Sequence, residues 1–328
     1  MAATTSSTFV IYAALAGNVL VAVSKFGAAA WTGSSAMLSE AVHSTVDCGN
    51  QLLMLYGIHR ASAPPDEQHP LGYGRELYFW SFIVALLIFS IGAGVSFYEG
   101  VNHILTPVPI TDPHVSYIVL ALSLLFEGTS WCFAVREFEK QRGGLGFLEA
   151  AARSRDPTSF LVLFEDSAAL IGIGIAFAGT FAAEWLQNPR LDGVASLGIS
   201  MVLAVTAAFL AHESKGLLIG EPAREPIRRS IIRIATDHVG ISAVGRLVTV
   251  HLAPRQIVAA LNVDFVDDLR ASEVEDVTHS LEQTISQHHP EIVALFLSPK
   301  KIALGFSPKV RTRSWASRAK SWKADRPT

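Results

Sequence analysis

The sequence predicts an α-helical membrane protein that carries a small soluble domain after its last helix. Half of the 328 residues are hydrophobic, only 17% are charged, and the mean hydropathy is +0.35. A soluble domain usually carries about 25% charged residues, so this chain has too little polar surface for water alone. Six apolar stretches are each long enough to cross roughly 30 Å of hydrocarbon as a helix.

The overall charge and the cysteine count argue against several other classes of protein. With 26 Lys and Arg against 29 Asp and Glu, the net charge of −3 is unlike that of proteins that bind nucleic acid through phosphate contacts. The two cysteines, Cys48 and Cys132, are too few for a disulfide scaffold or a four-thiolate zinc site. We therefore expect a lipid membrane as the surroundings and no nucleic-acid partner.

The six predicted spans fill the first part of the chain. They lie near Phe9–Trp31, Ser34–Ile58, Tyr78–Val101, Val115–Val135, Thr158–Ala182 and Val194–His212. The second span is the least apolar, because it contains Glu40, His43 and Asp47.

The basic residues between the spans predict the orientation in the membrane. The loops after the second and fourth spans hold seven Lys or Arg, whereas the opposite loops contain only Arg190. Because basic loops stay in the cytoplasm, this bias places both termini there. No Lys or Arg precedes Lys25, which argues against an Arg-rich transit peptide. We therefore expect a multi-pass protein of a bacterial inner (cytoplasmic) membrane.

Beyond His212 the pattern changes to that of a small domain of helices and strands. Amphipathic helices are predicted over Glu225–Val239 and Ala271–His288. Strands are predicted over Gly245–Leu252, Gln256–Phe265 and Ile292–Leu297. This order suggests one sheet that is covered on one face by both helices.

The predicted domain boundaries follow from these elements. We expect a membrane domain over residues 1–213, a soluble domain over residues 214–299 and a basic tail over residues 300–328. The tail has nine Lys or Arg and a single acidic residue, so we expect it to be disordered and to lie against anionic lipid.

Several ionisable side chains within the predicted spans are candidates for a site. Each such group costs roughly 2.5–3.5 kcal/mol at the centre of a bilayer, so its presence usually marks a function. The candidates are Glu40, His43, Asp47, Glu127, Glu165 and Asp166.

His43 and Asp47 are four residues apart, so they lie one above the other on one helix face. Glu40 precedes His43 by three residues and belongs to the same stripe. An imidazole and a carboxylate one turn apart can chelate a divalent cation, which would be zinc or, less selectively, manganese, iron or cobalt. The alternative is a neutral His43 that is hydrogen-bonded to Asp47 as a helix-packing contact.

The fifth span contributes Glu165 and Asp166. Adjacent residues of a helix point about 100° apart, so these two side chains cannot reach one point equally well. Two unpaired acids would be costly in a span, and a cation shared with the second span would offset that cost. The predicted metal site is therefore His43, Asp47 and Asp166, completed by Glu165 or water. Alternatively, Glu165 is protonated and hydrogen-bonded to a neighbouring span.

Two further residues of the spans remain open. Glu127 is compatible with a proton relay, with support of the metal ligands, and with structural hydrogen bonding. Lys25 lies deep in the first span, where it can extend towards an interface or pair with an acid.

The loop between the second and third spans contains Asp66, Glu67 and His69 close together. This grouping is compatible with a weak metal-collecting site, and equally with a polar turn that precedes a helix.

The sequence contains no motif of hydrolysis or nucleotide binding at a position where it could form an active site. These include H-E-x-x-H, G-x-S-x-G, Walker A and G-x-G-x-x-G. We therefore expect no enzymatic activity and no catalytic cofactor.

Several separated segments resemble the cation diffusion facilitator family. Gly33–Gln51, with its Ser-Glu-Ala-Val-His-Ser-Thr-Val-Asp core, resembles the family's second span. His69–Glu76, His-Pro-Leu-Gly-Tyr-Gly-Arg-Glu, resembles its loop signature before the third span. Arg155–Thr158 with the Glu-Asp pair that follows, and Leu191–Leu197, resemble the fifth and sixth spans. The resemblance covers about residues 10–300 and is closest to the zinc transporter 9-like branch and its bacterial relatives.

The resemblance implies six transmembrane helices, a C-terminal cytoplasmic ferredoxin-like α+β domain that dimerises, and divalent-metal export coupled to proton entry. The family's transport-site positions fall on His43, Asp47 and Asp166. The usual ligand one turn before that aspartate is here Val162, and the neighbouring Glu165 is similar to a substitute of this branch. A tyrosine, Tyr73, stands where the loop signature usually has a second histidine.

We therefore expect a homodimeric, proton-coupled exporter of divalent cations, above all zinc. Metal would bind from the cytoplasm, rocking of the helices would expose it to the other side, and protons would release it. The alternative is a non-transporting membrane metal sensor or scaffold that signals through the soluble domain. An intramembrane metalloenzyme is disfavoured, because no positioned general base accompanies the ligands.

Overall fold

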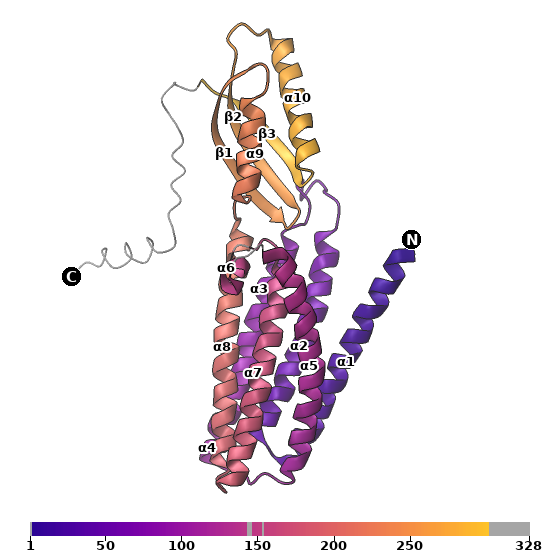
Figure 1. The fold of residues 1–328 in the computed structure, drawn as a ribbon, viewed down its shortest axis with the longest axis vertical. Coiled ribbons are helices and arrows are strands. Elements are labelled where there is room, and N and C mark those ends of the chain that lie inside the picture. Colours follow the sequence, from indigo (N-terminus) through magenta and orange to yellow (C-terminus); the bar gives the residue numbers. More distant parts are fainter. Residues whose placement is uncertain (1, 143–145, 153, 302–328) are drawn as a thin grey trace, which may run out of the picture. The chain divides into compact units, whose positions relative to one another are not determined.

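The protein is represented by a computed structural model that describes residues 2–142, 146–152 and 154–301. The described residues form two compact units, one made of those up to residue 221 with 251–254 and the other of residues 222–250 with 255–301. The first unit is a bundle of long helices and the second contains a small sheet (Figure 1). Most of the predicted basic tail, from residue 302 onwards, lies outside the described residues.

All six predicted spans are helical. The bundle consists of α1 (Ala2–Thr32), α2 (Ser35–Ala61), α3 (Glu76–Leu87), the π-helical segment η1 (Ile88–Ala93), α4 (Gly94–Leu105), α5 (Pro113–Arg142), α6 (Phe147–Ala152), α7 (Pro157–Trp185) and α8 (Arg190–Ile219). The helices extend beyond the predicted spans, because hydropathy marks only the apolar part of a helix. The short α6 has no counterpart in the prediction.

Length and composition support four of the six predicted spans. Within the described ranges, four helical segments are long and apolar enough to cross a membrane, namely Glu76–Leu105, Pro113–Lys140, Phe160–Trp185 and Arg190–Ile219. The first of these joins α3, η1 and α4 into one continuous span. Helix α2 has 27 residues but is less apolar, because it carries Glu40, His43 and Asp47.

The bundle has apolar side chains on its outside and charged side chains inside. Leu20, Leu125 and Phe177 are among the exposed large apolar residues, whereas Lys25 and Glu40 are fully buried. A protein in water shows the opposite distribution. Such a distribution is typical of a helix bundle that is surrounded by lipid and has a functional polar interior.

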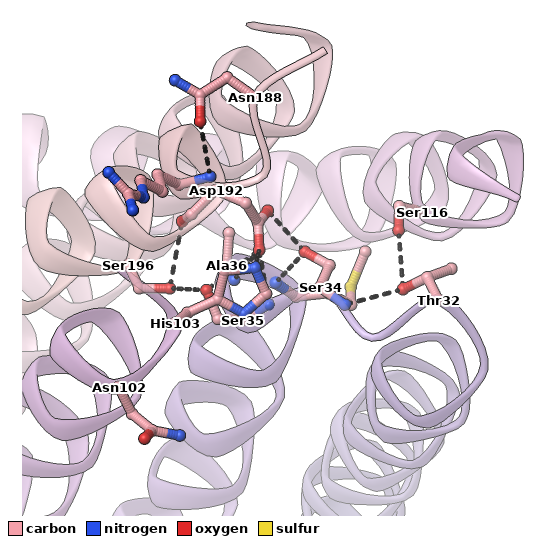
Figure 2. A network of polar contacts seen from close by, with 12 residues as sticks. Thr32, Ser34, Ser35, Ala36, Asn102, His103, Ser116, Asn188, Asp192 and Ser196 are labelled. Atoms are coloured by element: carbon pink, nitrogen blue, oxygen red, sulfur yellow. Dashed lines mark hydrogen bonds and ion pairs between the residues drawn. The ribbon is translucent and has the colours of Figure 1, made fainter. Parts of the chain in front are cut away.

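The N-terminus of α2 is held by a carboxylate from α8 (Figure 2). A helix leaves its first N–H groups without intrahelical acceptors. Ser34 Oγ accepts from the N–H of Met37 at 3.1 Å, as an N-cap residue does. Asp192 Oδ2 accepts from the N–H groups of Ser35 at 2.6 Å and Ala36 at 3.2 Å, and Oδ1 accepts from Ser34 Oγ at 2.7 Å. Asp192 thereby joins the start of α2 to the start of α8.

The glycine after Asp192 allows α4 to approach α8 closely. A Cβ atom at Gly193 would lie 2.9 Å from the carbonyl oxygen of Gly100, and one at Gly100 would lie 2.9 Å from that of Gly193. Close crossings at small residues are common between membrane helices. The Asp-Gly pair of the family-like motif therefore has a structural role, in which Asp192 caps α2 and Gly193 permits the crossing.

The π-helical turn η1 interrupts the third span. Such single turns disturb the regular hydrogen bonds of a helix, and a neighbouring side chain can bond the affected carbonyl. Here Ser200 Oγ of α8 donates to the carbonyl oxygen of Ala93 at 2.9 Å. The irregular backbone is thus supported inside the bundle.

The loop between α2 and α3 is organised around Asp66. Its Oδ1 accepts from the backbone N–H of His69 at 2.7 Å, and its Oδ2 accepts from the hydroxyl of Tyr73 at 2.6 Å. The hydrogen bond from Tyr73 holds the pKa of Asp66 below its usual value. Both carboxylate oxygens are therefore used within the loop, and the structure favours the polar turn over the metal-collecting site.

The second unit contains two helices and a three-stranded sheet of order β1-β2-β3. Its elements are α9 (Glu225–Thr236), β1 (Ile241–Ala253), β2 (Gln256–Phe265), α10 (Ala271–His288) and β3 (Ile292–Pro299). Strands β2 and β3 are parallel and are connected by α10. Alternate residues of β2, such as Ala259 and Leu261, are buried and share a core with Ile231 of α9 and Leu281 of α10. Both helices therefore cover the same face of the sheet, as the sequence predicts.

Replacing Asp192 by Ala should destabilise the bundle strongly, because two backbone N–H groups of α2 and two serine hydroxyls lose their shared acceptor. We expect a loss of about 3 kcal/mol or more in the free energy of unfolding. Asp192→Asn keeps one acceptor oxygen and should be intermediate. The melting temperature of the purified protein in detergent measures this order. Asp268→Ala, in an exposed loop, is the control, and equal melting temperatures for all variants would contradict the capping role.

Replacing Tyr73 by Phe should raise the pKa of Asp66 towards the ordinary aspartate value of about 3.9. The tyrosine hydroxyl stabilises the charged carboxylate, so its loss lets the proton bind at higher pH. A ¹³C NMR titration of protein labelled at the aspartate carboxyl carbons measures the change, with the resonance assigned through Asp66→Asn. Tyr98→Phe, on α4, should leave this titration unchanged. An identical titration in wild type and Tyr73→Phe would show that the hydrogen bond does not form.

Candidate metal site

A small cavity of about 40 Å³ lies within the helix bundle, among α1, α2, α5 and α7. Four of the side chains that line it carry carboxyl groups, namely Asp47, Glu127, Glu165 and Asp166. The remaining lining residues are polar or apolar: Asn18, Val21, Ser44, Gln51, Ser130, Val162 and Ala169. A cavity of this size has room for water or a small ion.

Helix α2 places His43 directly beside this cavity. As the spacing of four residues requires, His43 Nδ1 lies 3.4 Å from Asp47 Oδ1. This contact does not have the geometry of a hydrogen bond. Both ring nitrogens of His43 and Oδ1 of Asp47 are buried and have no hydrogen-bond partner among the residues that the structure describes. His43 is only 1% exposed. Buried polar atoms without partners are costly, so these three atoms are available to a ligand.

Helix α7 directs both Glu165 and Asp166 to the cavity. Glu165 Oε1 accepts from the side-chain amide of Asn50 at 2.5 Å, and Asp166 Oδ2 accepts from Ser130 Oγ at 2.9 Å. Both side chains line the cavity, but they are bonded from different helices, Glu165 by Asn50 of α2 and Asp166 by Ser130 of α5. Glu165 thus has the hydrogen bond to a neighbouring span that the alternative prediction includes, whereas the protonation that it also requires stays a prediction.

The carboxyl groups of Asp47 and Glu165 both line the cavity. Two neighbouring carboxylates repel each other when both are ionised, and a shared proton or a shared cation removes that repulsion. The cavity can therefore exchange protons against a cation at the same oxygen atoms.

Glu40 does not belong to this cavity, although it lies on the same stripe of α2 as His43 and Asp47. Its Oε2 accepts from the ammonium group of Lys25 at 3.0 Å. Lys25 also donates to Ser44 Oγ at 2.8 Å. The sequence pattern groups three side chains on one face, whereas the packing of α1 against α2 separates Glu40 from the other two.

The structure brings three of the four predicted ligands to one cavity and leaves His43 beside it. Over residues 2–142, 146–152 and 154–301, no three His, Cys, Asp or Glu side chains are already arranged to hold a metal ion. The predicted ligands thus surround a space without converging on a single point.

The two side chains that hydrogen-bond Glu165 and Asp166 were missed by the sequence analysis. Asn50 follows Asp47 by three residues and bonds Glu165, and Ser130 of α5 bonds Asp166. The spacing between Asp47 and Asn50 is a usable signal, because it extends the polar face of α2 by one turn. Ser130 gives no such signal, since its partner lies on another helix.

The sequence matches the family model of the cation efflux transmembrane domain over residues 11–219. The mitochondrial proton-coupled zinc antiporter SLC30A9 of Xenopus laevis is 32% identical over 322 residues, which cover 86% of this chain and 58% of that protein. The human SLC30A9 protein is 31% identical over 293 residues, with 88% and 52% covered. The cation-efflux pump FieF of Escherichia coli K12 is 26% identical over 265 residues, with 79% and 81% covered.

The chain thus spans little more than half the length of the SLC30A9 relatives and most of the length of FieF. The matched domain coincides with the helix bundle that contains the carboxylate-lined cavity. The resemblance drawn from the sequence motifs is confirmed, and the chain belongs to the cation efflux family, the cation diffusion facilitators, in the SLC30A9-like branch.

Proposed function

We propose that this protein exports divalent metal cations across a membrane in exchange for protons, and that zinc is its main substrate. The observation that carries this proposal is the cavity in the apolar bundle, lined by Asp47, Glu165 and Asp166 with His43 beside it. Carboxylate oxygens with an imidazole nitrogen suit zinc and, less selectively, manganese, iron and cobalt. The names of the relatives, a proton-coupled zinc antiporter and a cation-efflux pump, agree with this chemistry.

Proton coupling follows from the nature of the proposed ligands. A metal ion binds deprotonated carboxylates and a neutral imidazole, so protons compete with it for Asp47, Glu165, Asp166 and His43. Metal that enters from one side displaces protons, and protons that enter from the other side release the metal. The ligands surround the cavity loosely, so rocking of the helices can first draw them around the ion and then expose it to the other side.

The remaining architecture is proposed on the same basis. Six spans place the loops that hold Arg60, Arg75 and the basic residues after α5 in the cytoplasm, together with both termini. The sheet unit is then a cytoplasmic ferredoxin-like domain through which two copies of the chain associate. A bacterial cytoplasmic membrane is the proposed location.

A second candidate function is a metal sensor that does not transport. The compact sheet unit after α8 supports this alternative, because it could relay metal binding to a partner. The two functions differ in one measurable property, since a sensor binds metal but does not move it across a sealed vesicle.

Zinc uptake into sealed proteoliposomes under an imposed pH gradient tests the proposal. We expect gradient-dependent uptake with the wild-type protein, and with Asp47→Asn a fall to the level of protein-free vesicles. The asparagine keeps the volume of the side chain but removes a charged metal ligand. Asp112→Asn, an exposed carboxylate between α4 and α5, should retain uptake.

Uptake that persists in Asp47→Asn would overturn the site assignment. Wild-type protein that binds zinc but accumulates neither zinc, manganese, iron nor cobalt would overturn transport and favour the sensor.

A further inference from the structure

We infer that Glu127 of α5 is a ligand of the transported cation and that Lys25 of α1 positions it. This inference rests on the proposed function and extends its site to a third helix besides α2 and α7. One oxygen atom of Glu127 is held by Lys25, and the other faces no partner within the described residues although it is buried. Glu127 lines the same cavity as Asp47, Glu165 and Asp166.

The ammonium group of Lys25 is held in place by three hydrogen bonds. Its side chain is fully buried, and the ammonium group has three N–H donors. All three are used, by Glu127 Oε1 at 2.8 Å, Ser44 Oγ at 2.8 Å and Glu40 Oε2 at 3.0 Å. Because its three hydrogen bonds point in three directions, the ammonium group of Lys25 has a fixed position. It therefore holds Oε1 of Glu127 in place, and Oε2 can bind another ligand.

The charges around Lys25 favour a cation near Glu127. The single positive charge of Lys25 faces the two carboxylates of Glu40 and Glu127. With both acids ionised the cluster carries a net negative charge, and its Glu127 side borders the cavity. An uncompensated carboxylate in an apolar bundle is costly, and a bound cation would remove that cost.

The lining that α7 contributes to the cavity lacks an oxygen ligand at one position. Val162 lines the cavity one turn before Asp166 and presents only methyl groups there. Helix α5 presents Glu127 and, three residues later, Ser130, which bonds Asp166. The side chain of Glu127 therefore supplies an oxygen ligand that α7 does not provide through Val162.

Zinc binding by the purified full chain, measured by calorimetric titration without any transport, tests this assignment. Glu127→Gln should weaken zinc binding about tenfold or more, as expected for the loss of a charged ligand. Glu40→Gln is the matched control, because Glu40 pairs with Lys25 but does not line the cavity. Its zinc affinity should fall clearly less than that of Glu127→Gln, because Glu40→Gln removes a charge from the Lys25 cluster but no ligand oxygen from the cavity. Lys25→Met should weaken binding as Glu127→Gln does, and the double variant should be no weaker than either single variant.

A ligand exchange gives a second readout that a purely structural role would not change. In Glu127→Cys, a thiolate in contact with bound Co²⁺ produces a sulfur-to-metal charge-transfer band in the near ultraviolet. We expect this band in Glu127→Cys above the spectrum of the wild type, and not in Glu40→Cys. The cysteines Cys48 and Cys132 are present in all three proteins and give the common background.

The outcomes separate this inference from the proposed function. Zinc binding that requires Asp47 but is unchanged in Glu127→Gln, with no new band in Glu127→Cys, overturns the role of Glu127 and leaves the transport site standing. Wild-type protein that binds no zinc overturns both. An equal loss of affinity in Glu40→Gln and Glu127→Gln would reduce the Lys25 cluster to a structural role.

Discussion

A charged group buried among apolar helices needs a partner, and this constraint decides where the polar side chains of the bundle lie. Helix α2 carries most of these partners along its length. Its first N–H groups bond Asp192, its middle bonds Lys25 through Glu40 and Ser44, and its later part contributes Asp47 to the cavity. The helix that is least apolar in sequence is therefore the one to which the neighbouring helices are joined by polar contacts.

Much of the fold follows from the sequence because the hydrophobic pattern and the helix signals agree. Strand β2 and helix α10 begin and end where the pattern predicts, and each predicted span coincides with helical segments to within one residue. The irregular parts of the fold could not be predicted in this way. The π-helical turn η1 lies in a predominantly apolar stretch, where composition does not distinguish it from an α-helix. The short α6 is too brief to show a helical period.

The sequence predicts those features of the candidate site that depend on the spacing of residues within a single helix. The spacing of four residues correctly places His43 next to Asp47, since both lie on α2. Which way a helix face is turned depends on its neighbours, and sequence spacing cannot supply that. Glu40 thus pairs with Lys25 rather than lining the cavity, and the adjacent Glu165 and Asp166 both reach it. The family match supports metal transport in general. Whether a given side chain binds the metal has to be tested by substituting that side chain.

The three bonds of the Lys25 ammonium group also restrict how the bundle can move. They connect α1 with α2 through Glu40 and Ser44, and α1 with α5 through Glu127. Separating these helices would leave a buried charge without its partner, which costs about 3–5 kcal/mol. A rearrangement that keeps the three bonds displaces α1, α2 and α5 together as one rigid body. In the proposed transport cycle, a movement of α7 against these three helices would break the hydrogen bonds from Asn50 to Glu165 and from Ser130 to Asp166, which cost less to lose than the ion pairs of Lys25.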